Sequence, residues 1–173
     1  MEQQIHLRPA LPEDKVKIFD WMTNSDLTRE MLGPPTFPEI PVPTWEEFSD
    51  DYVDHYFDDT QPQLGRCFII EYRNLEIGQI NYNYIDATEK STEIDIWLAG
   101  SHYTGKGLGI QAIGLICDYL YQNFECKKIY IAPSQRNTRA IKAYKKAGFL
   151  ETKRLPRNFI PDYRDSIVFV KTT

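Results

Sequence analysis

The chain has 173 residues and a net charge of −5, with 42% hydrophobic and 26% charged side chains, which is typical of one ordinary globular domain and excludes a disordered or fibrous chain. No apolar run reaches the roughly 18 residues that a transmembrane helix needs, and the N-terminus lacks the basic-then-apolar layout of a signal peptide. We therefore predict a single domain over residues 1–173, located in the cytoplasm, with neither a membrane nor a nucleic acid as a partner.

The spacing of apolar residues and the turn residues between them predict ten elements. In chain order these are a strand at 4–8, helices at 12–22 and 44–57, strands at 66–73, 76–86 and 92–99, a helix at 107–123, a strand at 127–132, a helix at 137–148 and a strand at 162–172. Thr44 and Glu47 have the spacing of a capping box. The three consecutive strands predict an antiparallel meander, and the β-α-β-α-β order that follows predicts an α/β or α+β domain with a mixed sheet.

Five prolines lie between the first two helices, at positions 34, 35, 38, 41 and 43. This density of proline predicts a loop rather than a helix or a strand. Proteins of this size often carry binding surface on such loops.

The charges are unevenly distributed along the chain. Residues 1–126 carry 22 acidic and 8 basic side chains (−14), whereas residues 127–173 carry 3 acidic and 12 basic ones (+9). Residues 39–59 hold eight acids and no Lys or Arg. This separation favours an anionic ligand at one end of the domain and a cationic ligand at the other, although a solvated acidic helix and a solvated basic tail would have the same composition.

The stretch TGKGLG places Gly105, Gly107 and Gly109 around the start of the helix predicted at 107–123. It is not a P-loop, because glycine stands at 107 where that motif needs Ser or Thr. It is not a dinucleotide fingerprint either, because no acid follows the next strand at the ribose position. Glycines let the backbone approach a ligand closely, and the amides at the helix start favour negative charge. The loop therefore predicts a diphosphate site, with a simple tight turn as the alternative.

A second motif lies downstream in the segment PSQRNTRAIKAYKKAGF. Asn137 has the position of an N-cap, and Tyr144 lies on the same helical face, about 10 Å along the axis. With the glycine loop, these residues resemble the GNAT superfamily of N-acetyltransferases, over residues 66–149 above all. The resemblance implies a mixed, mostly antiparallel central sheet flanked by helices, and acetyl-CoA as the cosubstrate. Thr104 departs from the Gln or Arg that is usual there, which removes side-chain hydrogen bonding but leaves the backbone amides.

A narrower resemblance is to the aminoglycoside 6'-N-acetyltransferases, whose aspartate stands ten residues before the first loop glycine, here Asp95. It implies transfer of an acetyl group to the 6'-amino group of an aminoglycoside, and hence antibiotic resistance. A polyamine or a protein amine as acceptor remains an alternative, as does a noncatalytic acyl-CoA-binding regulatory domain. A monomer and a homodimer are both compatible with the sequence.

Acetyl transfer from a thioester needs a neutral amine, a polarised carbonyl and a proton for the departing thiol. Strand alternation places Glu93, Asp95 and Trp97 on one face of the strand at 92–99. Asp95 is our candidate for the base, with Glu93 either supporting it or merely solvated. Tyr144 is our candidate for the acid, with a packing role as its alternative. The resemblance implies that the amide of Leu98 or of a neighbour polarises the carbonyl.

These arguments predict two sets of binding residues. For acetyl-CoA they are Trp97, Leu98, Thr104, Gly105, Lys106, Gly107, Leu108, Gly109, Asn137 and Ala140. For the cationic acceptor they are Asp51, Asp54, Glu93 and Asp95. No metal site, disulfide framework or hydrolase triad is expected, because the three histidines are scattered and the three cysteines have no CxxC spacing. We expect the cysteines to be buried free thiols.

Overall fold

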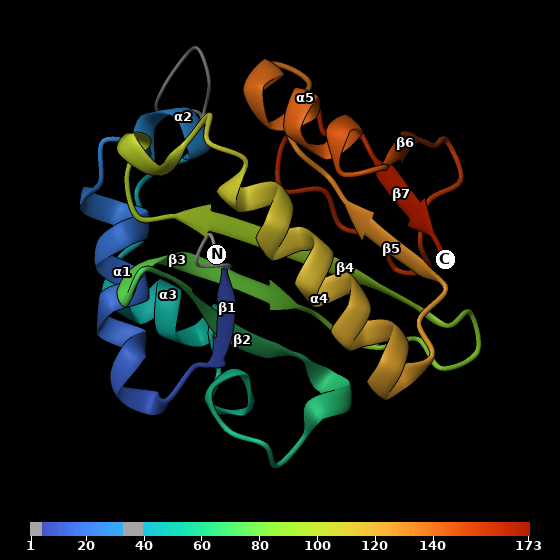
Figure 1. Ribbon diagram of the computed structural model, residues 1–173, viewed down its shortest axis with the longest axis horizontal. Helices are drawn as coiled ribbons and strands as arrows, with labels where there is room; N and C mark the ends of the chain where they lie inside the picture. Colours follow the sequence, from blue (N-terminus) through green and yellow to red (C-terminus); the bar gives the residue numbers. More distant parts are fainter. Residues whose placement is uncertain (1–4, 33–39) are drawn as a thin grey trace.

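A single seven-stranded sheet forms the centre of the computed structural model, which describes residues 5–32 and 40–173 (Figure 1). The strand order is β1-β2-β3-β4-β5-β7-β6. The strands are β1 (His6–Pro9), β2 (Arg66–Tyr72), β3 (Leu75–Tyr82), β4 (Ser91–Leu98), β5 (Lys128–Ile131), β6 (Leu150–Glu151) and β7 (Phe169–Thr172). All neighbouring strands pair antiparallel except β4 and β5, which are parallel. The predicted mixed, mostly antiparallel sheet is thereby confirmed.

Helices cover both faces of the sheet. They are α1 (Lys15–Asn24), α2 (Thr28–Leu32), α3 (Trp45–Asp51), α4 (Leu108–Phe124) and α5 (Thr138–Lys146). Alternation along β2 shows the two faces, since Phe68 and Ile70 join the core beneath α4, whereas Cys67 and Ile69 pack with Ile18 of α1. Figure 1 shows α4 crossing one face of the sheet, with α5 beside β5 and β7. The core beneath α4 includes Ile94 of β4, with Ile96 and Leu98 packed against it, and so fixes the strand on which the site depends.

The sheet divides between its two central strands. β4 pairs with β5 only from Ser91 to Glu93, although it continues along β3 as far as Leu98. The backbone N–H of Asn83 donates to the Glu93 carbonyl, and the backbone N–H of Ala99 donates to the Ile77 carbonyl. The backbone groups of the odd-numbered residues of β4 therefore form the hydrogen bonds to β3. Backbone groups of successive strand residues point to opposite sides. The amides of Ile96 and Leu98 therefore point away from β3, into the gap where β5 has diverged.

One predicted helix is wrong in its extent. The capping box is confirmed, because Thr44 Oγ1 accepts from the Glu47 amide at 3.2 Å and Glu47 Oε2 from the Thr44 amide at 2.8 Å. The chain nevertheless leaves the helix at Tyr52, and Asp54–Phe57 form a separate 3₁₀ turn. This turn lets the Tyr56 hydroxyl donate to Asn83 Oδ1 at 2.9 Å, a tertiary contact that apolar spacing does not reveal.

Other predicted elements also differ from those observed. The last strand is shorter than the predicted 162–172 and begins at Phe169, while the short α2 and β6 were not predicted. Of the predicted proline loop, Pro34, Pro35 and Pro38 lie outside the described residues, as does residue 4 of the first predicted strand. All three cysteines are buried free thiols. Within the described ranges, no helix is long and apolar enough to cross a membrane.

Candidate active site

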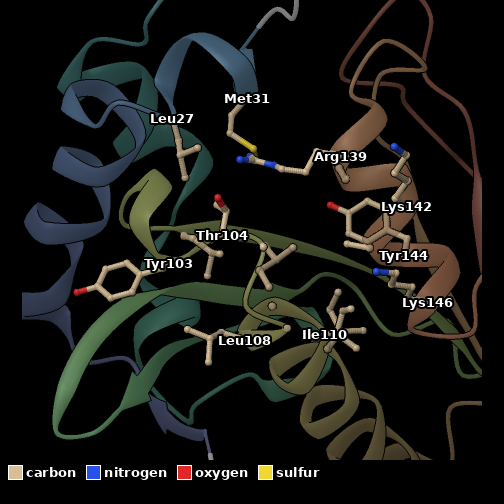
Figure 2. Close-up of a pocket in the computed structure, with 18 residues that line it drawn as sticks. Leu27, Met31, Tyr103, Thr104, Leu108, Ile110, Arg139, Lys142, Tyr144 and Lys146 are labelled. Carbon is tan, nitrogen blue, oxygen red and sulfur yellow. The ribbon is translucent and has the colours of Figure 1, made fainter.

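The glycine loop opens on a cavity of about 310 Å³. Its wall combines the loop and the first turn of α4 with Ile96 and Leu98 of β4 and with one side of α5 (Figure 2). The cavity thus lies where β4 and β5 diverge, and the Leu98 amide points into the same gap. Seven predicted acetyl-CoA residues line it, namely Leu98, Thr104, Gly105, Gly107, Leu108, Gly109 and Ala140.

The loop glycines are required by backbone conformation rather than by crowding. Gly105 (φ +70°) and Gly107 (φ +75°) adopt the left-handed conformation, which disfavours other residues. A Cβ at either position would meet no atom within 4 Å, so the space before the loop is open to a ligand. Gly107 is the N-cap of α4 and makes no side-chain cap bond. The first amides of this 17-residue helix therefore lack intrahelical partners, and the positive end of the helix faces the open space before the loop.

Cationic side chains lie on the wall opposite the loop. Arg139, Lys142 and Lys146 of α5 line the cavity, and Figure 2 shows Arg139 and Lys146 extending toward the centre of the cavity. Arg139 also pairs with Glu30 of α2 at 3.1 Å, which holds α2 next to the cavity. This cavity therefore combines a helix N-terminus with basic side chains.

Three predicted acetyl-CoA residues lie elsewhere. Lys106 is exposed and is not part of the cavity wall. Trp97 points to the opposite face of the sheet, where its indole N–H donates to the Trp21 carbonyl at 3.1 Å. Asn137 is the N-cap of α5, as expected, because its Oδ1 accepts from the Ala140 amide at 3.2 Å. Trp97 and Asn137 both line a second cavity instead.

This second cavity, of about 620 Å³, meets the first at shared residues. Met31, Ile96 and Tyr144 belong to the walls of both. Figure 2 shows the Tyr144 ring on α5 with its hydroxyl directed into the first cavity. Burial raises the pKa of Tyr144 above its ordinary value, so the phenol keeps its proton at neutral pH. Tyr144 thus places a protonated hydroxyl at the junction of the two cavities.

Asp95 lies in the second cavity at the centre of a side-chain network. Its Oδ2 accepts from Asn83 Nδ2 at 3.1 Å and from Asn81 Nδ2 at 3.3 Å. Asn83 Oδ1 in turn accepts from Asn81 Nδ2 at 3.0 Å and from the Tyr56 hydroxyl at 2.9 Å. Burial raises the pKa of Asp95, and the two asparagine hydrogen bonds lower it, with burial the stronger effect. A carboxylate with a raised pKa is a better proton acceptor than an exposed aspartate.

Further carboxylates surround Asp95. Asp51 and Asp162 line the same cavity, whereas Asp54 is exposed and lies outside its wall. Burial and the neighbouring Asp95 raise the pKa of Asp162 to about 6. Glu93 is half-buried rather than freely solvated, and burial together with Asp95 raises its pKa to about 8. With this raised pKa Glu93 is mostly protonated at neutral pH, and a bound cation would favour the charged forms of Asp95, Asp162 and Glu93.

Several residues of the second cavity were missed in the sequence. Gln79 and Asn81 of β3, and Asn83 directly after it, lie on the same face of the sheet as Asp95 of β4. The period-two pattern could therefore have identified them. Asp162 gave no such signal, because it lies in the basic C-terminal part. Tyr163 beside it donates its hydroxyl to the Met31 carbonyl, which holds this segment against α2 over the cavity.

A family model described as "Acetyltransferase (GNAT) domain" matches residues 4–150. Among curated proteins, the spermidine N(1)-acetyltransferase of Escherichia coli (strain K12) is 28% identical over 165 residues, which is 94% of this chain and 83% of that protein. The aminoglycoside N(6')-acetyltransferase type 1 of Klebsiella pneumoniae is 43% identical over 56 residues, which is 32% of this chain and 28% of that protein.

Solved structures share the fold. AAC(6')-Ib in complex with coenzyme A and kanamycin has a TM-score of 0.74 at 23% identity, covering 98% of this chain and 95% of that one. The spermidine N-acetyltransferase from Vibrio cholerae, in complex with CoA and spermine, has a TM-score of 0.70 at 24% identity, covering 96% and 93%. At these identities the likeness shows a common fold.

Proposed function

The chain belongs to the GNAT acetyltransferase family, and on that premise we propose that it transfers the acetyl group of acetyl-CoA to a primary amine of a polycationic small molecule. One observation carries the proposal. A cavity lined by the carboxylates of Asp51, Asp95 and Asp162 meets, at Tyr144, a cavity with an anion-binding loop and a cationic wall. An anionic donor and a cationic acceptor can therefore meet at a single side chain.

The first cavity fits acetyl-CoA in charge and in shape. The amides of the glycine loop and of the first turn of α4 would bind the diphosphate, and Arg139, Lys142 and Lys146 would neutralise its charge. The open space before Gly105 and Gly107 lets the diphosphate approach the backbone. Relatives of this fold bind CoA in solved structures, which supports the assignment.

The chemistry follows from three groups of this chain, with acetyl-CoA supplying the thioester. Asp95 removes the proton from the ammonium, directly or through water, and so frees the nitrogen lone pair that attacks the acetyl carbon. The Leu98 amide donates to the carbonyl oxygen as it gains charge. As the carbon–sulfur bond breaks, Tyr144 donates its proton to the thiolate, and the second proton that the nitrogen loses on becoming an amide returns Tyr144 to its neutral form. The products are an acetylated amine and free CoA, and the proton taken by Asp95 returns to solvent.

Two acceptors are candidates within this class. The 6'-amino group of an aminoglycoside is supported by the position of Asp95, the AI..Y.KAGF helix and the 43% identical segment of the Klebsiella enzyme. A linear polyamine is supported by the spermidine acetyltransferase of Escherichia coli, which is similar over nearly the whole chain. Both acceptors are polycations, as the three carboxylates require.

A panel of amines tests the proposal. Thiol release from acetyl-CoA would be measured with spermidine, spermine, kanamycin, ribostamycin and a lysine-containing peptide, and the products identified by mass spectrometry. We expect turnover with at least one polycation and little with uncharged or acidic amines, and magnetic resonance of the product identifies the acetylated nitrogen. Binding of acetyl-CoA without turnover on any amine would favour the noncatalytic domain.

A further inference from the structure

Two amide side chains on the polar face of β3 bury oxygen atoms that have no protein partner. Gln79 is 1% exposed and Asn81 is 3% exposed, and both line the carboxylate-lined cavity. Within the described part of the chain, Gln79 Oε1 and Asn81 Oδ1 accept no hydrogen bond. A buried acceptor without a partner lowers stability, and folded proteins contain few of them.

The third amide of this face differs from the other two. Asn83 Oδ1 accepts both from the Tyr56 hydroxyl and from Asn81 Nδ2, so it is fully used inside the protein. Asn81 itself donates its N–H groups to Asn83 and Asp95, which leaves only its oxygen unused. In this network the N–H groups of Asn81 and Asn83 donate to Asp95, whereas the oxygens of Gln79 and Asn81 accept no hydrogen bond from the described residues. A ligand that satisfies this cavity must bring N–H or O–H donors.

The sheet register places Gln79 beside Asp95 on the same face of the sheet. Asn81 is the cross-strand partner of Asp95, and Gln79 is that of Trp97. Gly78, next to Gln79, pairs with Leu98, whose amide points into the acetyl-CoA gap. Two residues along a strand span about 7 Å. An amine held at Asp95 therefore lies about 7 Å from the backbone of Gln79 along the strand, within reach of its side chain.

We propose that Gln79 Oε1 and Asn81 Oδ1 accept N–H hydrogen bonds from the acceptor amine and hold the attacking nitrogen beside Asp95. The inference rests on the proposed function, and it assigns Gln79 as a positioning residue for the acceptor. Amide oxygens suit this task because they bind the N–H groups of a neutral amine as well as those of an ammonium. A carboxylate in the same place would stabilise the ammonium form, which cannot attack.

The substitution Gln79→Met tests the assignment because it keeps the length of the side chain and removes the acceptor. We expect kcat/KM for the amine to fall about tenfold, the ratio that one such hydrogen bond is worth, while the Kd of acetyl-CoA stays unchanged. The thermal midpoint should equal or exceed that of the parent, since an unpaired buried oxygen has been removed. Gln63→Met, at an exposed position outside both cavities, is the matched control.

A conservative variant supplies a second measurement. Gln79→Glu keeps acceptor oxygens at the same reach and adds charge, so it should retain amine binding better than Gln79→Met. It should also move the pH of half-maximal kcat/KM upward, because the carboxylate favours the ammonium form. A profile that is unmoved or shifted downward in Gln79→Glu would contradict the role in keeping the nitrogen neutral.

The probes are spermidine and kanamycin, each measured by steady-state turnover and by the thermal shift that it induces. If the parent acetylates one of them and Gln79→Met matches the parent in KM, kcat and thermal shift, the Gln79 assignment is overturned and the proposed function stands. If Gln79→Met only lowers the thermal midpoint, Gln79 is a packing residue. If the parent neither binds nor acetylates either probe, the proposed function fails and this inference fails with it.

Discussion

Replacing Asp95 by asparagine removes a charge from the carboxylate-lined cavity without changing its shape. The new amide oxygen can still accept the bonds from Asn81 and Asn83 that Oδ2 accepts now, at 3.3 and 3.1 Å. The fold and the acetyl-CoA cavity should therefore be unaffected. What is lost is the proton acceptor, together with the negative charge that faces the acceptor amine.

The size of the effect has two parts. Loss of a general base typically costs 10²–10⁴-fold in rate, which is about 2.7–5.5 kcal/mol of activation free energy at 1.36 kcal/mol per factor of ten. The lost charge also weakens binding of the cation, since two unit charges about 4 Å apart attract by about 4 kcal/mol at an effective dielectric constant of 20, part of which desolvation offsets. Both kcat and the affinity for the amine should therefore fall.

Steady-state thiol release at saturating acetyl-CoA, measured from pH 5 to pH 9, checks this expectation. In the parent, kcat/KM should rise with pH as Asp95 loses its proton, at a pH above the ordinary aspartate range because burial raises its pKa. The variant should lack that rise. Asp118→Asn, an exposed position on α4 outside both cavities, is the control. A variant that is as fast as the parent and keeps its pH profile would refute the base role, and the amine would then reach the site already neutral.

Four other expectations are open to measurement. Gly107→Val should weaken acetyl-CoA binding, measured by calorimetry, far more than Gly109→Ala does. The backbone φ is positive at 107 and a side chain there would fill the ligand space, whereas a Cβ at 109 would meet only Ile96 at 3.7 Å. Equal affinities of the two variants would contradict the loop assignment. Tyr144→Phe should lower kcat with little change in the Kd of acetyl-CoA, and an undiminished kcat would make the tyrosine a packing residue. The KM of the cationic acceptor should rise with salt, since exposed charges are screened over about 8 Å at physiological ionic strength, and a flat dependence counts against the acidic cavity. Glu93 has its pKa raised from 4.5 to about 8 in the folded state, so the free energy of unfolding of the parent, measured with urea, should fall as the pH rises through that window. The fall is at most a few kcal/mol, at about 1.4 kcal/mol per pKa unit, and Glu93→Gln should reduce it.

Local signals in the sequence predicted most of the fold correctly. The capping box at Thr44, the N-cap at Asn137 and the glycines before α4 are each recognised within one turn of chain, and each is present in the structure. The five-residue α2 and the two-residue β6 are too short for any periodicity to reveal. The break after α3 depends on a contact between Tyr56 and Asn83, which lie far apart in the sequence.

The same distinction applies to the candidate site. Asp95 and Tyr144 stand in recognisable motifs, whereas Asp162 reaches the cavity from a loop in which basic residues outnumber acidic ones. The separation of β4 from β5 after Glu93 is a property of pairing that no single strand reveals. The unpaired oxygens of Gln79 and Asn81 become visible only when every hydrogen bond of the network is assigned.

The divergence of β4 from β5 also makes the second half of β4 an edge strand in the middle of a sheet. From Ile94 to Leu98 none of the described strands pairs with its outer backbone groups, and such edges are prone to pair with other chains. α5 and Tyr144 cover part of this edge, and a bound molecule with amide groups along its length could cover the rest as a surrogate strand. The cosubstrate would then complete the sheet as well as react. A ligand that binds only the folded state stabilises that state in proportion to the logarithm of the ligand concentration. The protein would therefore be most resistant to aggregation when acetyl-CoA is abundant.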